Sequence, residues 1–282
     1  MQNRRVVLFS ILFSFCLFSL ASAQPIRFAP LPMLSKSEVG KNFQPFAHYL
    51  STITSTDVEI IYHKSYQTLL DGLINDQIDL AYLGPLPYVS LTQQDPSYVP
   101  VVRFVNQHGE ASYTCALVSF DSPLSRFDSV LLPTVALTQP QSTCGYLVTE
   151  QLLQQLHTSL NDLPYYYAGQ HSECALEVLR GKAQFAGMKT SIARQYHKLG
   201  LSVVVQSDSL PGFLLVANSR TLDGDTIRKI RTSLLELNSP SGAVTTASWG
   251  KMIRYGAIPV QSSDYDGIRQ MVDRIKIPEG DL

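Results

Sequence analysis

The sequence lacks the cysteine and histidine motifs of common metal sites. No C-x-x-C pair and no His/Cys cluster with zinc spacing occurs in its 282 residues, so we expect neither a metal nor a cofactor. It also lacks an excess of basic residues, because 22 lysines and arginines are set against 23 aspartates and glutamates. This balance argues against nucleic acid or an anionic membrane surface as the main partner. Beyond the N-terminal segment, no apolar run is long enough to cross a bilayer.

The N-terminal segment, residues 1–23, has the three parts of a secretory signal peptide. Arg4 and Arg5 give a basic start, residues 6–20 are apolar, and Ala21-Ser22-Ala23 is a small-residue cleavage site. A membrane anchor is the alternative, but the apolar run is short for a span, and Cys16 stands in a poor setting for a lipoprotein cysteine. We therefore expect cleavage after Ala23 and a soluble periplasmic product. Its net charge is −3, because the leader removes two basic residues and no acidic one.

Three cysteines remain after cleavage: Cys115, Cys144 and Cys174. An exported chain enters an oxidising compartment, which favours one disulfide and one free thiol. The spacing alone does not select the pair.

Strand-like runs alternate with helical patterns along the mature chain. Strands are expected at 26–29, 58–62, 79–83, 99–105, 113–119, 134–137, 163–167, 184–188, 203–205 and 213–217. Helices are expected at 39–53, 66–74, 146–156, 173–179, 192–199, 225–237, 241–252 and 264–275. This alternation predicts an α/β fold of two lobes, each a mostly parallel sheet flanked by helices. Residues 24–110 and 208–282 form one lobe and 111–207 the other, so two crossings make a hinge whose closure buries a ligand.

The junction between the strand at 134–137 and the following helix carries Ser142, Thr143 and Gly145. The first N–H groups of a helix lack partners and the helix dipole is positive there, so an anion is favoured. A simple N-cap is the alternative for Ser142 or Thr143. Other strand ends would face this junction across a cleft, because ligands of open α/β sheets bind outside the carboxyl ends of strands.

Four stretches at these turns resemble the periplasmic substrate-binding proteins of phosphonate, phosphite and phosphate ABC transporters. Asp79–Val89 is similar to an Asp-hydrophobic-Ala-aromatic-x-Gly-Pro segment, and Gln141–Leu147 to a Ser-Thr-Ser-Gly anion loop. Ala168–His171 matches a strand-end Gly-x-His, and Ser209–Gly212 resembles the return crossing. The resemblance covers nearly all of the mature chain in the same order. It implies a two-lobed periplasmic binding protein fold of the second type, with two hinge crossings and no catalysis.

The resemblance also implies a ligand and the residues that hold it. The ligand is a small oxyanion of the phosphonate, phosphite or phosphate class, taken up through an ABC-transporter permease by a monomeric binding protein. The implied ligand-binding residues are Ser142, Thr143, Cys144, Gly145 and His171 of the inserted lobe, and Tyr66, Tyr82, Leu83, Gly84 and Pro85 of the other lobe.

Three positions depart from the family pattern. Cys144 replaces the third loop serine by a weaker hydrogen-bond donor. Lys189 stands where the family is expected to place an acidic residue, and it either favours a more highly charged anion or points to solvent. Cys174 follows His171 closely, so Cys144 and Cys174 both open helices beside the cleft and are the favoured disulfide pair.

Several residue roles have structural alternatives. His171 can be a structural histidine; as a ligand, it would bind an anion more tightly when protonated near pH 6.5. Tyr66 and Tyr82 can be core aromatics. A Cys144/His171 thiol hydrolase is the enzyme alternative, because a helix N-terminus lowers a thiol pKa. A module that reports an oxyanion to a membrane sensor kinase remains open beside transport.

Overall fold

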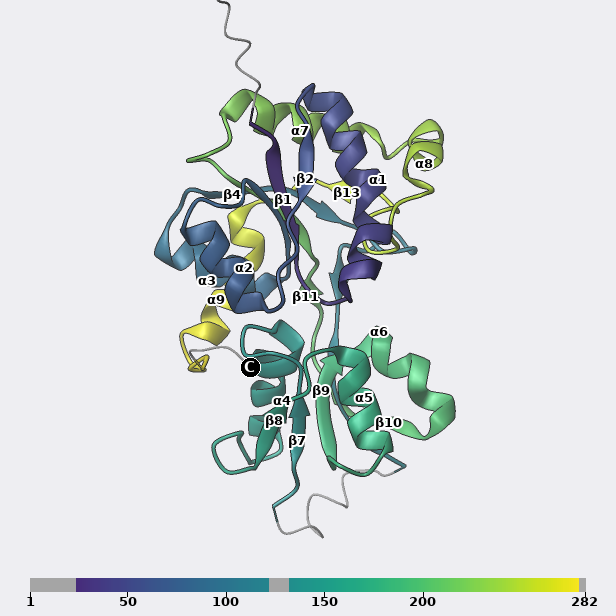
Figure 1. Ribbon diagram of the computed structural model, residues 1–282. Coiled ribbons are helices and arrows are strands. Elements are labelled where there is room, and N and C mark those ends of the chain that lie inside the picture. The colour runs from purple at the N-terminus through teal and green to yellow at the C-terminus, as the bar shows by residue number, and fades with distance from the viewer. Residues whose placement is uncertain (1–23, 122–131, 279–282) are drawn as a thin grey trace, which may run out of the picture.

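The computed structural model describes residues 24–121 and 132–278, so the predicted signal peptide lies outside the described part. Two α/β lobes, each built on its own sheet, lie one above the other (Figure 1). The first lobe contains β1 (Ile26–Pro30), α1 (Lys36–Thr54), β2 (Val58–Ile60), α2 (Tyr66–Ile74), β3 (Leu80–Leu83), α3 (Pro85–Gln94), β4 (Tyr98–Phe104), β12 (Leu214–Asn218), α7 (Gly224–Glu236), α8 (Pro240–Thr246), β13 (Ala257–Ile258), the short helix η4 (Ser262–Tyr265) and α9 (Asp266–Val272).

The second lobe is formed by the segment inserted between β4 and β12. It contains β6 (Cys115–Phe120), β7 (Val135–Leu137), the π-helical turn η2 (Thr143–Leu147), α4 (Val148–Gln155), β8 (Tyr165–Tyr167), α5 (His171–Leu179), β9 (Phe185–Lys189), α6 (Thr190–Ala193), the 3-10 helix η3 (Arg194–Leu199) and β10 (Leu201–Gln206). The turn η2 runs directly into α4, so the two form one continuous helical segment.

Both sheets are mixed, which corrects the expectation of mostly parallel sheets. The first has the order β13-β4-β12-β3-β1-β2, in which β1 pairs in parallel with β2 and β3, while β12 is antiparallel to β3 and β4. The second has the order β10-β6-β9-β7-β8, in which β7 is parallel to β8 and β9, while β6 is antiparallel to β9 and β10. Most of the antiparallel pairs involve the strand that enters each lobe at a crossing, β12 in the first lobe and β6 in the second, which runs against both of its neighbours.

The two crossings between the lobes lie side by side. The outgoing strand β5 (Ser112–Tyr113) pairs antiparallel with the returning strand β11 (Leu210–Pro211), in a small sheet of two strands. Such a pair of connections joins the lobes at one edge and leaves a cleft beside it. The lobe boundaries at 110/111 and 207/208 remain a prediction.

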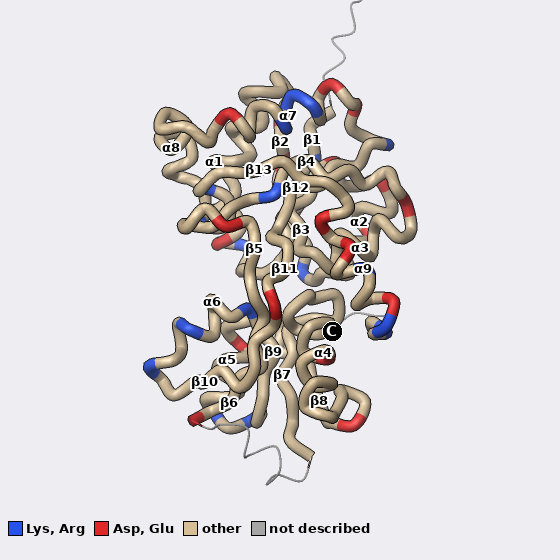
Figure 2. Tube along the Cα trace, turned by 180° about the vertical axis from the view of Figure 1, so that it is seen from behind, with Lys and Arg blue, Asp and Glu red and all other residues tan. Residues whose placement is uncertain are grey.

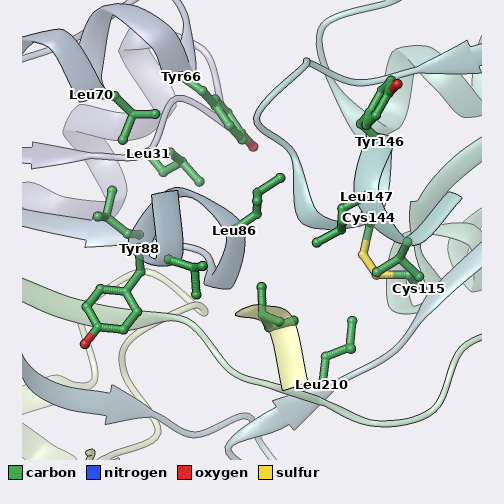
Figure 3. Packing of buried hydrophobic residues seen from close by; sticks show 14 of the residues in the cluster. Leu31, Tyr66, Leu70, Leu86, Tyr88, Cys115, Cys144, Tyr146, Leu147 and Leu210 are labelled. Atoms are coloured by element: carbon green, nitrogen blue, oxygen red, sulfur yellow. A yellow bond between two sulfur atoms is a disulfide. The ribbon is translucent and has the colours of Figure 1, made fainter. Parts of the chain in front are cut away.

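Apolar packing continues from one lobe into the other. Helices α2, α3 and α9 cover one face of the first sheet, and their buried side chains belong to the same cluster as those of η2 and α4. Figure 3 shows members of this cluster from both lobes, including Leu31 and Leu86 of the first and Leu147 of the second. Separate clusters lie beneath α1 and α7 in the first lobe and beneath α5 in the second. The lobes are therefore in direct contact in this structure.

Two segments, residues 84–87 and 241–252, differ from the sequence prediction. Pro85 and Pro87 indicate a break after the strand predicted at 79–83, with no helix before 99–105, yet Gly84 is the N-cap of α3 and Pro85 its first residue. Proline is well suited to the first position of a helix, where its missing N–H is not needed. The helix predicted at 241–252 ends at Thr246, and the chain then turns so that the Gly250 N–H donates to the Asn42 carbonyl at 2.8 Å.

Candidate functional site

Two adjoining cavities lie between the lobes. The inner cavity, of about 10 Å³, is lined by Leu31, Tyr66, Gly84, Pro87, Tyr113, Ser142, Thr143, Cys144, His171, Lys189 and Phe213. The outer cavity, of about 460 Å³, shares Tyr113, His171, Lys189 and Phe213 with it. These four side chains therefore form the wall between the two spaces.

The Ser-Thr loop lies against the inner cavity as the sequence predicts. Ser142 caps η2, because its Oγ accepts the Gly145 N–H at 3.0 Å, and its hydroxyl hydrogen remains available to an anion. No hydrogen bond within the described residues uses the N–H groups of Thr143 and Cys144. Gly145 itself permits close packing, because a Cβ there would lie 1.8 Å from Thr138 Oγ1. Capping and anion binding are thus compatible roles for Ser142.

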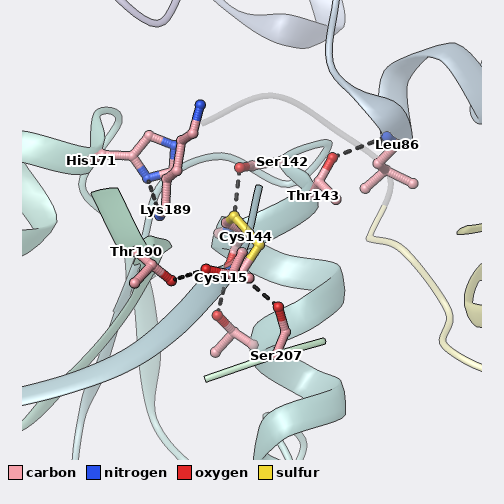
Figure 4. The surroundings of a disulfide bond; sticks show 12 residues. Leu86, Cys115, Ser142, Thr143, Cys144, His171, Lys189, Thr190 and Ser207 are labelled. Carbon is pink, nitrogen blue, oxygen red and sulfur yellow. Dashed lines mark hydrogen bonds between the residues drawn. A yellow bond between two sulfur atoms is a disulfide. The ribbon is translucent and has the colours of Figure 1, made fainter. Parts of the chain in front are cut away.

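The first lobe presents two helix N-termini to this loop. The Tyr66 N–H of α2 donates to Gln139 Oε1 at 2.9 Å, and the Leu86 N–H of α3 donates to Thr143 Oγ1 at 3.0 Å (Figure 4). A third interlobe bond runs from Ser90 Oγ to Gln141 Oε1 at 3.2 Å. Uncharged side-chain oxygens of the second lobe therefore accept hydrogen bonds from the N–H groups of Tyr66 and Leu86. The same N–H groups could instead donate to an anion.

Four helices begin at the inner cavity. Tyr66 opens α2, Gly84 caps α3, Thr143 opens η2 and His171 opens α5, and all four residues line the cavity. The positive ends of the corresponding helix dipoles converge there. Such a convergence favours an anion and does not require a net positive surface.

His171 is a neutral hydrogen-bond donor toward the cavity. Its Nδ1 accepts the Lys189 N–H at 3.4 Å, which assigns the ring proton to Nε2 (Figure 4). Burial, and secondarily the nearby Lys189 charge, lowers the pKa of His171 to about 4. The expectation that it protonates near pH 6.5 is therefore wrong for this arrangement.

Lys189 ends β9 and is half-buried at the shared wall. Its Nζ lies 4.9 Å from the ring centroid of Tyr113 and 5.1 Å from that of Phe213. Burial lowers the pKa of Lys189 to about 8. The side chain thus lies in the cleft instead of pointing into open solvent.

The remaining predicted residues divide into two groups. Tyr66 and Gly84 line the inner cavity, and Tyr82 lines the outer cavity, where its ring stacks on Phe213 at a centroid distance of 5.4 Å. Leu83 and Pro85 are buried and line neither cavity. Pro85 moreover has no N–H to offer, and Pro87 takes the lining position.

The disulfide joins Cys115 to Cys144, with a Cα–Cα distance of 5.2 Å, and Cys174 is free and buried. The predicted Cys144–Cys174 pair is wrong because the second sheet separates them. Cys144 packs with Leu117 and Leu137 on one face, whereas Cys174 packs with Ala116 and Ala136 on the other. Figure 3 shows the bond next to Leu147, and Figure 4 shows it beside Ser142 and Thr143. Because the Cys144 sulfur is bonded, it is not a nucleophile, which contradicts the thiol-hydrolase alternative.

Three lining or supporting residues were missed by the sequence reasoning. Tyr113 and Phe213 lie on the outgoing and returning crossings, and Gln139 follows β7. Burial raises the pKa of Tyr113, and its buried hydroxyl has no well-formed hydrogen bond in the described part. In the sequence, Tyr113 and Phe213 lie next to the predicted crossings and Gln139 follows a predicted strand end, and these positions could have indicated that they line the cleft.

The described residues contain neither a metal-binding cluster nor a membrane-spanning helix. No three or more His, Cys, Asp or Glu side chains come together there in a way that could hold a metal ion. Within the same ranges, no helix combines the length and the apolar character needed to span a membrane.

Comparison with known proteins agrees with this architecture. The family model "ABC transporter, phosphonate, periplasmic substrate-binding protein" matches residues 28–265. Phosphate-import protein PhnD of Mycolicibacterium smegmatis is 25% identical over 280 residues, covering 89% of this chain and 85% of that protein.

Solved structures show the same fold. PhnD1 from Prochlorococcus marinus in complex with methylphosphonate has a TM-score of 0.74 at 15% identity, covering 88% of this chain and 97% of that one. A binding protein component of an ABC phosphonate transporter from Pseudomonas aeruginosa has a TM-score of 0.74 at 20% identity, covering 88% of this chain and 85% of that one.

Two lobes joined by two crossings, with a cavity between them, define the periplasmic binding protein fold. The chain belongs to the family of periplasmic phosphonate-binding proteins of ABC transporters. It is therefore an extracytoplasmic solute-binding component, with a membrane permease as its partner.

Proposed function

We propose that this protein captures a phosphonate, phosphite or phosphate in the inner cavity and delivers it, as a monomer, to its permease. The observation that carries the proposal is the convergence of four helix N-termini on one cavity. The names of a phosphate-import relative and of a methylphosphonate-bound structure support the same class of ligand.

In this proposal, each side of the cavity donates to the anion. The hydroxyls of Ser142 and Thr143, the N–H groups of Thr143 and Cys144, and the Nε2–H of His171 come from the second lobe. The N–H of Tyr66 and that of Leu86 come from the first, where they exchange Gln139 and Thr143 for the more negative ligand oxygens. Each hydrogen bond to a charged group contributes about 1.5–3 kcal/mol, so a few of them account for tight capture.

The direct test is the Ser142→Ala variant in calorimetric titrations with phosphate, phosphite and methylphosphonate. We expect the preferred anion to bind roughly ten- to a hundredfold more weakly, since one charge-assisted bond is lost. Sulfate is included as a control oxyanion that contains no phosphorus. At about 100 times its dissociation constant, the preferred anion should add about 2.7 kcal/mol to the wild-type free energy of unfolding.

The matched control is Ser239→Ala. Ser239 caps α8 by accepting the Gly242 N–H at 3.2 Å, as Ser142 does for Gly145 at 3.0 Å, but it lies outside both interlobe cavities. This control should lose stability and keep wild-type affinity. Equal affinities in the Ser142→Ala variant and the wild type would remove the Ser-Thr loop from the site, and no binding of any tested anion would overturn the proposed function.

A further inference from the structure

The wall between the two cavities carries hydrogen-bond donors without acidic partners. Lys189 forms no ion pair within the described residues, and its Nζ lies over the Tyr113 ring, 4.9 Å from the centroid. The Tyr113 hydroxyl is buried next to Thr143, without a well-formed hydrogen bond in the described part. His171 adds an Nε2–H, because its Nδ1 is already an acceptor. Cation, hydroxyl and imidazole N–H therefore converge on one stretch of the cleft, where the charged form of Lys189 is only partly hydrated.

The nearby carboxylates form no ion pair with this wall. Glu38 and Glu110 line the outer cavity and keep their negative charges, because their hydrogen-bond donors, Ser35 and the Asn106 amide, are neutral. Lys189 and Lys251 line the same cavity, and Arg194 lines a groove that also contains Lys189. Three cations therefore face two carboxylates, and no ion pair among residues 24–121 and 132–278 joins any of them.

The inner cavity, of about 10 Å³, has room for only about one water in this arrangement, so an oxyanion enters it when the lobes move apart, whereas the outer cavity already has room for a substituent. A head group beside Ser142 and Thr143 reaches the outer cavity only past the four shared residues. The outer cavity holds about 460 Å³ and is partly apolar, with Met33, Leu34 and Phe104 among its lining residues. The substituent on the head group would therefore meet Lys189 and Tyr113 at the entrance to that space.

We infer that the ligand carries a second acidic group, held by Lys189 and the Tyr113 hydroxyl while its phosphorus head occupies the inner cavity. This inference rests on the proposed function and narrows it to phosphonates or phosphate esters with an acidic substituent. A positively charged substituent would be repelled by Lys189. A neutral substituent would leave Lys189 and the Tyr113 hydroxyl without a hydrogen-bond acceptor.

The test compares three phosphonates of similar length that differ in terminal charge. They are phosphonoacetate (acidic), ethylphosphonate (neutral) and 2-aminoethylphosphonate (basic), each titrated calorimetrically at pH 7. Wild-type protein should bind phosphonoacetate at least tenfold more tightly than ethylphosphonate, and 2-aminoethylphosphonate most weakly. Lys189→Met keeps an unbranched stem against Tyr113 and Phe213 and should reduce the acidic preference to within about threefold. Lys198→Met, an exposed lysine of the same lobe that lines neither cavity, should keep it.

The outcomes separate this inference from the proposed function. Equal wild-type affinities for phosphonoacetate and ethylphosphonate would overturn the second acidic group while leaving phosphonate binding intact. A preference that persists in Lys189→Met would remove Lys189 from the recognition. Failure of the wild-type protein to bind any phosphonate, phosphite or phosphate would overturn both. The wild-type comparison decides the matter even if the variant does not fold.

Discussion

The charge states of His171 and Lys189 are set by their shared burial at the cleft wall. Each group would be more easily protonated in water, because burial lowers both pKa values and the Lys189 charge lowers that of His171 further. Between about pH 4 and pH 8, the pair holds one cation, on Lys189, and one neutral donor, on His171. These two charge states could not be predicted from the sequence, because a histidine at a strand end is expected to have an ordinary pKa unless its burial is known.

Anion binding should therefore respond to alkaline pH through Lys189 and not to mildly acidic pH through His171. The lysine is charged below pH 8, so its attraction for an anion is lost as pH rises above that value in the free protein. With phosphonoacetate, we expect wild-type affinity to fall about tenfold relative to Lys189→Met between pH 7 and 9.5. Comparison with that variant cancels the titration of the ligand itself. A loss of affinity between pH 5.5 and 7 that is abolished in His171→Gln would show instead that the imidazolium binds the anion.

Stability should move in the opposite sense to binding at alkaline pH. Burial lowers the pKa of Lys189 from its ordinary value of 10.5 to about 8, so the unfolded chain binds more protons than the folded protein between these two pH values. The ligand-free protein should therefore gain stability as pH rises from 8 to 10.5, and Lys189→Met should show a smaller gain. Urea unfolding at pH 7.5, 9 and 10.5 measures this difference. A stability that falls by the same amount in both proteins would contradict the buried, uncompensated state of Lys189.

At the scale of single elements, the sequence predicted those whose signals are local. Helix α2 has the predicted bounds because its apolar spacing and the Ser65 cap lie within the helix itself. Helix α3 was missed because Pro85 and Pro87 were interpreted as a stop, although Pro85 is compatible with a helix start. The disulfide pairing could not be predicted, because it depends on which face of the second sheet each cysteine occupies. That face is set by strand pairing between segments that are distant in the sequence. Tyr113 and Phe213 were missed for the same reason, since they meet only where two crossings pair.

The Cys115–Cys144 bond fixes the helical segment η2–α4, which carries the Ser-Thr loop, to strand β6. It closes a loop across a sequence separation of 29, which should stabilise the fold by roughly 3 kcal/mol. Replacing both cysteines by alanine should lower the melting temperature by roughly 6–12 °C and remove its sensitivity to reductant. Cys174→Ala, which deletes a buried sulfur without touching the bond, is the control and should remain reductant-sensitive. Peptide mapping of the unreduced mature protein that found Cys174 in the bond would contradict this assignment.

At the scale of the whole molecule, two weak sets of contacts hold the lobes together. The interlobe apolar cluster provides non-directional contact, while three hydrogen bonds align residues 139–143 with the N-termini of α2 and α3. Figure 2 shows acidic and basic residues distributed over both lobes. Charge over the whole surface therefore does not select the ligand. Selection belongs to the few polar groups between the lobes, and closure is needed to bring both halves of that set together.

Ligand should consequently shift the protein toward the closed arrangement, and Gln139 should contribute to that shift. Its side chain is the acceptor for the Tyr66 N–H and also donates to the Gly169 carbonyl at 3.3 Å, so it orients the loop and the interface together. Dyes on the exposed positions Ser37→Cys and His197→Cys, one in each lobe, would report closure by energy transfer. We expect phosphonoacetate to raise the transfer efficiency, and Gln139→Ala to require about five- to tenfold more ligand for the same change. Gln67→Ala, which removes a half-buried glutamine on α2 that bonds only Asp71 within the described residues, should behave as wild type. If saturating ligand left the transfer efficiency unchanged, the two crossings would not act as a hinge, and capture would have to occur in a preformed cleft.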